Sequence, residues 1–389
     1  MLCLKGGEEN MDFKQLKIDI IEYSKTIGID KIGFASTDVF TELKQRLITQ
    51  QELGYQSGFE ESDIEKRTNP RLLLPTAQSI ISIALAYPNK MKNPPKGAKG
   101  ERRGIFCRAS WGEDYHFILR DRLQKLEAYI SERVPEAKMK SMVDTGELSD
   151  RAVAERAGIG WSGKNCAIIT PEFGTYVYLG EMITNIPFEP DTPMEDQCGS
   201  CNKCIEACPT GALVQGGQLD SNKCIAFLTQ TKGFLADKYR TKIGNRLYGC
   251  DSCQTACPEN KGKDFHFHEE MEPEPEVVKP KLKGLLHISN REFKEVYGPL
   301  SGSWRGKKPI QRNAILALAF FKDESAISDL VKVLHEDPRP VIRGTAAWAL
   351  GKIGTIDAMD ALKKVQQREK DESVLQEIEK GLNMYTTKG

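Results

Sequence analysis

Eight cysteines between residues 198 and 257 constrain this chain more than any other feature of its sequence. The first four read Cys198-x-x-Cys201-x-x-Cys204-x-x-x-Cys208-Pro209, and the last three read Cys250-x-x-Cys253-x-x-x-Cys257-Pro258, with Cys224 alone between the two runs. The first run has the spacing with which bacterial ferredoxins hold a [4Fe-4S] cluster, and in that pattern the fourth cysteine ligates a second cluster. The spacing therefore predicts two [4Fe-4S] clusters.

Crossing the ligands between the two runs, as in two-cluster ferredoxins, gives two sets of four thiolates. Cluster one takes Cys198, Cys201, Cys204 and Cys257, and cluster two takes Cys208, Cys224, Cys250 and Cys253. The alternatives are two zinc sites or a disulfide framework. Zinc usually takes paired Cys-x-x-Cys units, and disulfide frameworks belong to short secreted chains. Of the remaining cysteines, which are Cys3, Cys107 and Cys166, we expect Cys166 to be simply buried.

Length and composition indicate an ordinary globular protein. A chain of 389 residues is long enough for two or three domains, and its formal net charge of zero gives no overall sign of a polyanion partner. Its apolar runs stay below the ~18 residues of a membrane span, and its start lacks a signal-peptide core. We therefore expect a cytoplasmic protein with reduced thiols and no membrane partner.

The first ten residues differ from the rest of the chain. Lys5-Gly6-Gly7-Glu8 is what a ribosome-binding site would encode if it were translated, and Met11 follows at a suitable distance. We therefore expect residues 1–10 to be a disordered extension before the true start. A genuine flexible tail is the alternative.

Residues 11–190 alternate helical and strand-like patterns, which predicts an α/β domain. Helices are expected at 13–27, 114–134 and 150–157, and strands at 31–35, 78–86, 140–143, 167–170 and 176–184. Gly158-x-Gly160-x-x-Gly163 matches a dinucleotide fingerprint in its letters, but it follows a helix instead of a strand, so we do not expect nicotinamide binding. Asp144 ends a strand before a helix that Ser149 caps, a position that suits either catalysis or a turn.

The rest of the chain divides into three parts. Residues 191–262 form the ferredoxin-like module, with Cys224 on a helix at 221–229, and residues 263–308 form a linker and helix in which His266 and His268 are expected to be solvated. Residues 309–389 form HEAT-like repeats, because the run Ala314–Leu318 recurs 32 residues later at Ala346–Leu350. Basic residues near the starts of the repeats suit either a phosphate backbone or a solvated helix end: Arg305, Lys307, Lys308, Arg312, Arg339 and Arg343.

Five motifs that precede the cysteines carry a resemblance to a known family. They are Arg67-x-Asn69-Pro70-Arg71, Cys107-Arg-Ala-Ser-Trp-Gly-Glu-Asp114-Tyr115-His116, Val143-Asp144-Thr-Gly146, Arg156-Ala-Gly158-Ile-Gly160-Trp161-x-Gly163-Lys164-Asn165 and Leu179-Gly180-Glu181. Together with the cysteines and the repeats, they make the chain from Met11 onward resemble the epoxyqueuosine reductases, which are related to reductive dehalogenases. The resemblance implies an α/β cobalamin-binding domain, a ferredoxin-like module with two [4Fe-4S] clusters, and a C-terminal HEAT-like domain.

The same resemblance implies a function. The chain would reduce the epoxide of epoxyqueuosine at the tRNA wobble position to queuosine, using Co(I) cobalamin that receives electrons through the two clusters. Asp144 matches the proton donor of that family, and an acid that acts near neutral pH is expected to have a raised pKa. An external donor of ferredoxin or flavodoxin type would deliver electrons to cluster one of a monomeric enzyme.

Further site residues follow from the resemblance. The cobalamin pocket would be formed by Arg67, Cys107, Asp144, Lys164, Ile168, Leu179, Ala226, Cys250 and Asp251. Cys107 would be either a weak neighbour of the cobalt or a small filler. The tRNA backbone would contact Lys232, Arg240, Lys242, Arg246, Arg305 and Lys308. Two other functions stay open, namely a dehalogenase-like reductase of small molecules and a non-catalytic iron-sulfur electron carrier, and binding of unmodified anticodon stem-loop RNA would separate both from the tRNA enzyme.

Overall fold

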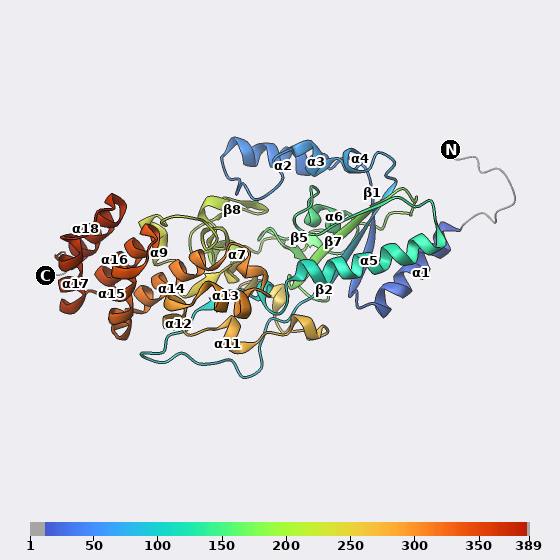
Figure 1. Cartoon of the computed structure of the whole chain (residues 1–389). Helices are drawn as coiled ribbons and strands as arrows, with labels where there is room; N and C mark the ends of the chain where they lie inside the picture. Colours follow the sequence, from blue (N-terminus) through green and yellow to red (C-terminus); the bar gives the residue numbers. More distant parts are fainter. Residues whose placement is uncertain (1–11, 387–389) are drawn as a thin grey trace.

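The computed structural model describes residues 12–386, so the predicted extension at 1–10 and Cys3 lie outside the described residues. The molecule is elongated, with a sheet domain at one end, helical repeats at the other and the cysteine-rich segment between them (Figure 1). The predicted architecture of a sheet domain, a cysteine module and helical repeats is confirmed.

The N-terminal domain is built on one four-stranded sheet. Its strands are β1 (Lys31–Ser36), β2 (Ser79–Ala86), β7 (Val177–Thr184) and β4 (Met139–Met142), in the order β1-β2-β7-β4. Every neighbouring pair is antiparallel. The strand β2, with the β-branched sequence SIISIALA, is buried along its whole length because helices cover both faces of the sheet.

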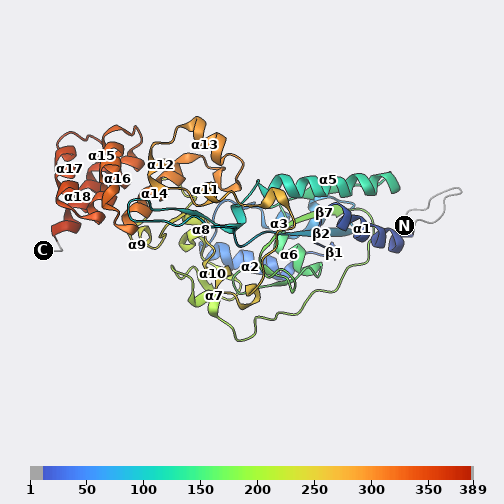
Figure 2. The ribbon, with the colours of Figure 1, turned by 90° about the horizontal axis from the view of Figure 1, so that it is seen from below.

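The two faces of the sheet have different covers. The helices α1 (Phe13–Thr26) and α5 (Tyr115–Arg133) pack on one face, and α6 (Asp150–Arg156) packs on the other, as Figure 2 shows for α5 and α6. Because the sheet is antiparallel, Asp144 does not lie at a shared carboxyl edge of parallel strands. The loop between β4 and α6 presents it.

Short elements complete this domain. They are α2 (Thr41–Glu52), α3 (Ile64–Thr68), α4 (Pro70–Leu73), β3 (Ile105–Phe106), the 3-10 helix η1 (Arg108–Ser110), β5 (Trp161–Ser162) and β6 (Ile168–Ile169). Gly158, with φ of 68°, ends α6, and the strand β5 follows it. The Gly158–Gly163 motif thus connects a helix to a strand, as predicted, and lacks the strand-to-helix context of a dinucleotide site.

The cysteine module consists of short pieces. Its elements are α7 (Lys203–Glu206), β8 (Leu213–Gln215), β9 (Gln218–Leu219), η2 (Ser221–Lys223), α8 (Ile225–Leu228), α9 (Asp237–Arg240), β10 (Arg246–Tyr248), α10 (Ser252–Thr255) and η3 (Pro258–Asn260). The strand β10 pairs in parallel with β3 of the first domain. Cys224 lies between η2 and α8, so the predicted single helix over 221–229 is wrong.

The C-terminal part is helical throughout. It comprises η4 (Glu269–Met271), α11 (Pro275–Val278), α12 (Leu282–His287), α13 (Asn290–Tyr297), η5 (Ser301–Ser303), α14 (Lys307–Phe321), η6 (Glu324–Ala326), α15 (Ile327–Glu336), α16 (Pro340–Ile353), α17 (Ile356–Gln366) and α18 (Glu372–Thr386). The repeated alanine-rich runs lie in α14 and α16, and α15 and α17 follow them, which agrees with the predicted two-helix repeat.

One hydrophobic core joins the cysteine module to the repeats. Ile225 and Leu247 of the module belong to the same buried cluster as Leu282 of the predicted linker and Ala317 of α14. The module, the linker and the repeats therefore pack as one body. His268 of the linker is buried, with Nε2 2.7 Å from Asp30 Oδ2, so the expectation of a solvated side chain is wrong for His268.

Candidate active site and cluster sites

The fold brings the two cysteine runs and Cys224 near one another. Cys257 lies close enough to Cys198 and Cys204 for their charges to affect it, and Cys224 is affected in the same way by Cys208 and Cys250. All ten described cysteines are free thiols. Segments far apart in the chain thus meet as the crossed ferredoxin pattern requires.

The surroundings of Cys208 suit a cluster sulfur. Burial raises the pKa of this thiol, but backbone N–H groups of Leu213, Thr210 and Ala212 outweigh burial and lower the pKa overall. The N–H of Ala212 donates to the sulfur at 3.2 Å. Donors of this kind stabilise cluster thiolates and tune their potential.

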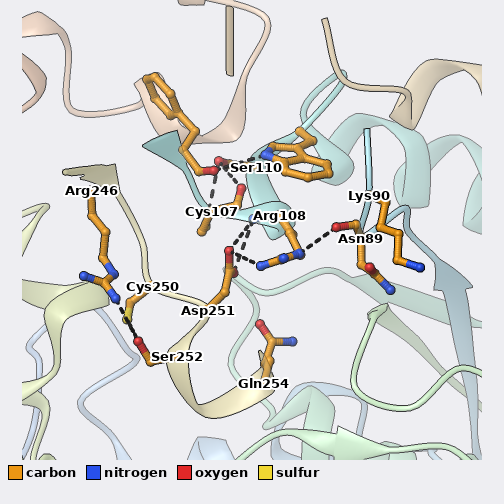
Figure 3. Close-up of polar contacts among 12 residues, drawn as sticks. Asn89, Lys90, Cys107, Arg108, Ser110, Arg246, Cys250, Asp251, Ser252 and Gln254 are labelled. Atoms are coloured by element: carbon orange, nitrogen blue, oxygen red, sulfur yellow. Dashed lines mark hydrogen bonds and ion pairs between the residues drawn. The ribbon is translucent and has the colours of Figure 1, made fainter. Parts of the chain in front are cut away.

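An arginine-carboxylate pair fixes the segment that follows Cys250 (Figure 3). The Nη1 atom of Arg108 lies 2.9 Å from Asp251 Oδ2, and the backbone N–H of Arg108 donates to the same carboxylate. The Nε–H of Arg108 donates to the carbonyl of Asn89 at 2.7 Å. The carboxylate of Asp251 is therefore engaged within the protein, which leaves its backbone as the group able to face a cofactor.

Cys107 packs tightly against the same segment. A Cβ placed on Gly249 would lie 2.2 Å from Cys107 Sγ, so only glycine fits at that position. Burial, reinforced by the nearby charge of Asp251, raises the pKa of Cys107 well above its usual range. A neutral, closely packed thiol favours the interpretation of Cys107 as a filler.

Asp144 lies in the loop between β4 and α6 and is 59% exposed. Its backbone N–H donates to Asp150 Oδ2 at 2.8 Å, and its own Oδ2 lies 3.4 Å from His116 Nε2. The other ring nitrogen of His116, Nδ1, lies 2.6 Å from Asp114 Oδ1. One imidazole thus lies between two carboxylates.

The pKa of Asp144 differs from the sequence-based expectation. The ion pair with His116 lowers the pKa of Asp144, so the predicted raised pKa is wrong. Burial opposes the charge on His116, but Asp114 and Asp144 together raise the pKa of His116 to about 9. Near neutral pH the pair consists of a carboxylate and an imidazolium ion.

The sequence analysis did not assign a role to His116. The sequence signal for His116 is local. Asp114 caps α5 by accepting the backbone N–H of His116, and this places the imidazole ring beside the capping carboxylate. The contact with Asp144 joins residues 28 positions apart, and no spacing rule reveals it.

Two further carboxyls lie below this loop. Burial, together with the charge of Asp144, raises the pKa of Asp150 to about 6. Glu181 on β7 is fully buried, and neither of its oxygens has a hydrogen-bond partner among the described residues. Burial raises the pKa of Glu181 far above its usual range, so this side chain is neutral.

The other predicted cobalamin residues fall into two groups. Ile168 and Leu179 lie on the sheet face covered by α6, and Arg67 on α3 is close enough to Asp150 to feel its charge. Ala226 and Cys250 lie in the segments around cluster two. Lys164 donates to the carbonyl of Gly199 at 2.7 Å and is therefore fastened to the first cysteine loop.

Three predicted tRNA contacts line one cavity of about 270 Å³ between the cysteine module and the repeats. The charged residues that line it are all cationic: Lys232, Arg305, Lys308 and Arg312. The Arg305 guanidinium also stacks on the rings of Trp304 and Phe59, with distances of 4.4 and 4.6 Å to the ring centroids. A half-buried cation over aromatic rings suits the binding of single-stranded nucleic acid.

The remaining predicted tRNA contacts differ in how accessible they are. Lys242 is exposed, whereas Arg246 donates to the carbonyl of Ile243 and to the hydroxyl of Ser252. Arg240 is 3% exposed and forms a two-pronged ion pair with Glu377, so the prediction that it contacts RNA is wrong. A buried guanidinium needs a partner. Asp237, three residues away, contacts Nε at 3.1 Å, but the buried two-pronged partner Glu377 lies far away in the sequence.

Arg312 is also an internal residue. Its guanidinium donates to the carbonyls of Leu228, Thr231 and Gly233, at 2.8, 2.7 and 3.0 Å. Arg339 and Arg343 pair with Asp337 and Glu369. Of the basic residues near the starts of the repeats, these three therefore serve structure.

The two sets of thiols, together with the acid-base group of Asp144 and His116, define the class of protein as an iron-sulfur oxidoreductase. Three family models match the chain: "Epoxyqueuosine reductase QueG, DUF1730" over residues 67–145, "4Fe-4S double cluster binding domain" over 197–260 and "HEAT repeats" over 306–383. The second match supports clusters over the zinc and disulfide alternatives. No helix within residues 12–386 is long and apolar enough to cross a membrane.

Relatives of known activity cover almost the whole chain. An epoxyqueuosine reductase of Bacillus cereus is 74% identical over 378 residues, which are 97% of this chain and 100% of the relative. A crystal structure of epoxyqueuosine reductase with a tRNA-Tyr epoxyqueuosine-modified stem loop has 66% identity and a TM-score of 0.95, and it covers 96% of this chain and 100% of its own. A Bacillus subtilis enzyme of equal identity and coverage, with a TM-score of 0.94, is described with an aspartate catalytic loop swung out of the active site. The chain belongs to the epoxyqueuosine reductase family.

Proposed function

We propose that this protein reduces the epoxide of epoxyqueuosine, at the wobble position in the anticodon loop of tRNA, to queuosine. The relative solved with a modified tRNA stem loop supports this substrate. The observation that carries the proposal is Tyr248, which lies close enough to Asp144 for the charge of that carboxylate to add to burial in raising the pKa of the tyrosine. Tyr248 is two residues from Cys250, which supports an acid group close to the segment that carries the second set of thiols.

The chemistry needs both a reductant and an acid. When an epoxide becomes an alkene, both C–O bonds of its oxygen break and the oxygen leaves as water, which consumes two electrons and two protons. We propose cobalamin as the cofactor, which when bound and reduced to Co(I) supplies the electron pair. The two [4Fe-4S] clusters would deliver the electrons, and the residues proposed for the cofactor include Cys250 of the second set of thiols.

The residues that would hold the cobalamin lie around the sheet face below α6 and the segment of cluster two. They are Arg67, Lys164, Ile168, Leu179, Ala226, Cys250 and Asp251, together with Cys107 as a packing residue. The polar rim of a corrin requires hydrogen-bond partners, and Asn165 supports the fit because its buried Nδ2 has no partner within the described chain. Backbone groups of Leu179 and Asp251 supply further donors and acceptors.

The protein's own residues hold the protons. At neutral pH His116 carries one proton and Asp144 none, since the imidazole has the higher pKa of the two. In this proposal one proton passes from His116 Nε2 to Asp144 Oδ2, which lies 3.4 Å away, and from Asp144 to the leaving oxygen, and the second proton of the water is taken up from solvent. Asp114 holds the ring in place through Nδ1.

The substrate and the electrons arrive from opposite directions in this proposal. The RNA backbone lies against the cationic cavity with Lys232, Arg305 and Lys308, and an external low-potential donor of ferredoxin or flavodoxin type reaches cluster one. The Bacillus subtilis enzyme is described with an aspartate catalytic loop swung out of the active site, and we propose that the exposed loop that carries Asp144 is its counterpart. We further propose that the protein acts as a cytoplasmic monomer.

The test is a reconstitution without oxygen. Protein supplied with iron, sulfide and cobalamin should contain ~8 irons and one corrin per chain, and should remove one oxygen atom from the epoxide nucleoside of a tRNA stem loop. Asp144→Asn should keep both cofactors and lose turnover, whereas Asp121→Asn, a change on α5 at a carboxylate paired with Lys125, should keep all three properties. Full iron without corrin binding would refute the cobalamin mechanism.

A rival function is tested in the same preparation. An electron carrier or a reductase of small molecules would not bind an unmodified anticodon stem loop. Binding that is lost in a variant with Lys232 and Lys308 replaced by alanine supports the tRNA enzyme, and the absence of binding by the wild-type protein would overturn it.

A further inference from the structure

We propose that Asp150 is a positioning residue for Asp144, and that its carboxylate holds the loop of residues 143–149 in the reactive position by accepting the backbone N–H of Asp144. The role rests on the proposed function, because it matters only if Asp144 delivers a proton. The hydrogen bond itself, 2.8 Å from the nitrogen to Asp150 Oδ2, does not depend on that function.

The conformation of Asp144 requires an external restraint. Its φ angle is +51°, in the left-handed region that residues with a Cβ seldom occupy. Such conformations persist only where surrounding contacts determine them. Asp150 fixes the peptide group between Val143 and Asp144 by accepting its N–H. The N–H of Thr145 donates to the carbonyl of Val143 at 2.5 Å. The turn is therefore held on both sides of Asp144.

The side chain of Asp144 does not supply this restraint. It is 59% exposed, and its carboxylate lies 3.4 Å from His116 Nε2, a distance at the long end for a hydrogen bond. Further along, Gly146 folds back on β4 so closely that a Cβ there would lie 2.6 Å from the Cβ of Met142. The loop is therefore fixed through its backbone, and Asp150 supplies the side-chain anchor nearest the acid.

The surroundings of Asp150 suit an anchor better than a second acid. Asp144 faces it from the loop, Arg151 from its own helix, Arg67 from α3 and Glu181 from the sheet. Glu181 is buried and neutral, so it adds no charge against the Asp150 carboxylate. The Oδ2 atom of Asp150 accepts the backbone N–H of Asp144, and this contact orients the loop without consuming a proton.

Two substitutions separate the hydrogen bond from the rest of the side chain. Asp150→Asn keeps an oxygen acceptor of the same reach, whereas Asp150→Ala removes it. Glu155→Ala is the matched control, because Glu155 is a carboxylate of the same helix that also accepts a backbone N–H, that of Ser162, away from Asp144. Each variant is measured in the full chain for kcat, for KM with the modified stem loop, and for hydrogen-deuterium exchange of residues 143–149.

We expect Asp150→Ala to lower kcat at least tenfold, equivalent to ~1.4 kcal/mol, with KM changed less than threefold. Exchange of the Asp144 amide should accelerate by a similar factor. Asp150→Asn and Glu155→Ala should stay within threefold of the wild type in both measurements. If Asp150→Ala does not fold, Asp150→Ser, whose hydroxyl is too short to reach, takes its place.

The outcomes are distinct. An unchanged kcat or unchanged exchange in Asp150→Ala overturns the positioning role, and so does an Asp150→Asn variant that behaves like the alanine variant, because charge instead of the hydrogen bond would then be responsible. A wild-type protein that reduces no epoxide refutes the proposed function, while the exchange measurement still tests the anchor.

Discussion

Replacement of His116 by glutamine tests where the proton is stored. A pKa that rises from an ordinary 6.5 to about 9 corresponds to ~3 kcal/mol of extra interaction between the imidazolium ion and its surroundings, which contain Asp114 and Asp144. Glutamine occupies similar space and cannot carry a proton. Asp144 would then have to protonate by itself, and with an ordinary pKa of ~3.9 only ~0.1% of it is protonated at pH 7.

We therefore expect His116→Gln to lower the single-turnover rate at pH 7 by ~10²–10³-fold, within the range typical of general acids. The wild-type rate should fall as the pH rises through about 9, where His116 loses its proton. The rate of the variant should instead rise steadily as the pH falls. Anaerobic single turnovers of the modified stem loop between pH 6 and 10 measure both profiles.

The difference in free energy of unfolding between the wild type and His116→Gln should show the same titration of His116. Because the folded pKa of His116 lies above its unfolded value, its contribution is fully present below pH ~6.5 and is lost as the pH rises through about 9. Urea unfolding should show a wild-type advantage of ~3 kcal/mol at pH 6 that disappears near pH 10. His287→Gln, at a histidine 3.0 Å from Asp329 in the repeats, is the control and should leave turnover unchanged. A His116→Gln rate within threefold of the wild type at pH 7 would refute this reasoning.

Three other predictions follow from the geometry. Arg240→Ala should lower the free energy of unfolding by ~1.5–3 kcal/mol, because it removes the two-pronged partner of the buried Glu377 and leaves that carboxylate only its contact with Lys380, and a loss below ~1 kcal/mol in urea unfolding would contradict this. Cys253→Ala should reduce the iron content from ~8 to ~4 per chain in the assay of reconstituted protein, and full iron would disprove the ligand set. Alanine at both Lys232 and Lys308 should weaken stem-loop binding and reduce the salt slope by ~1.4, whereas alanine at the exposed Lys363 should change neither.

Local patterns predicted most of the elements. The cysteine spacing, the β-branched run of β2 and the 32-residue repeat are each confined to a short stretch, and each corresponds to the observed structure. The antiparallel strand order could not be predicted in this way, because it depends on which distant segments pair.

The same limit explains the errors in the site. Arg240 and Lys232 look alike in sequence, and only the position of Glu377, on a helix 137 residues away, decides that Arg240 is internal. Likewise the pKa of Asp144 is set by His116, which approaches from a different helix. Residue type predicted which chemical groups are available at the site. The partners that folding brings together determined which of them are buried and in which direction their pKa values shift.

Arg312 ties the repeats to the stretch just after Cys224, and it also lines the cationic cavity. Because one buried side chain joins the two, an RNA bound as proposed would rest at a fixed distance from the second set of thiols. The protein would then select a nucleic acid by the length of its loop as well as by its charge. A hairpin whose loop is one nucleotide shorter or longer would bind the same cations but hold its modified base at the wrong distance from the second set of thiols. Loop length would then be a separate criterion by which the protein selects its substrate.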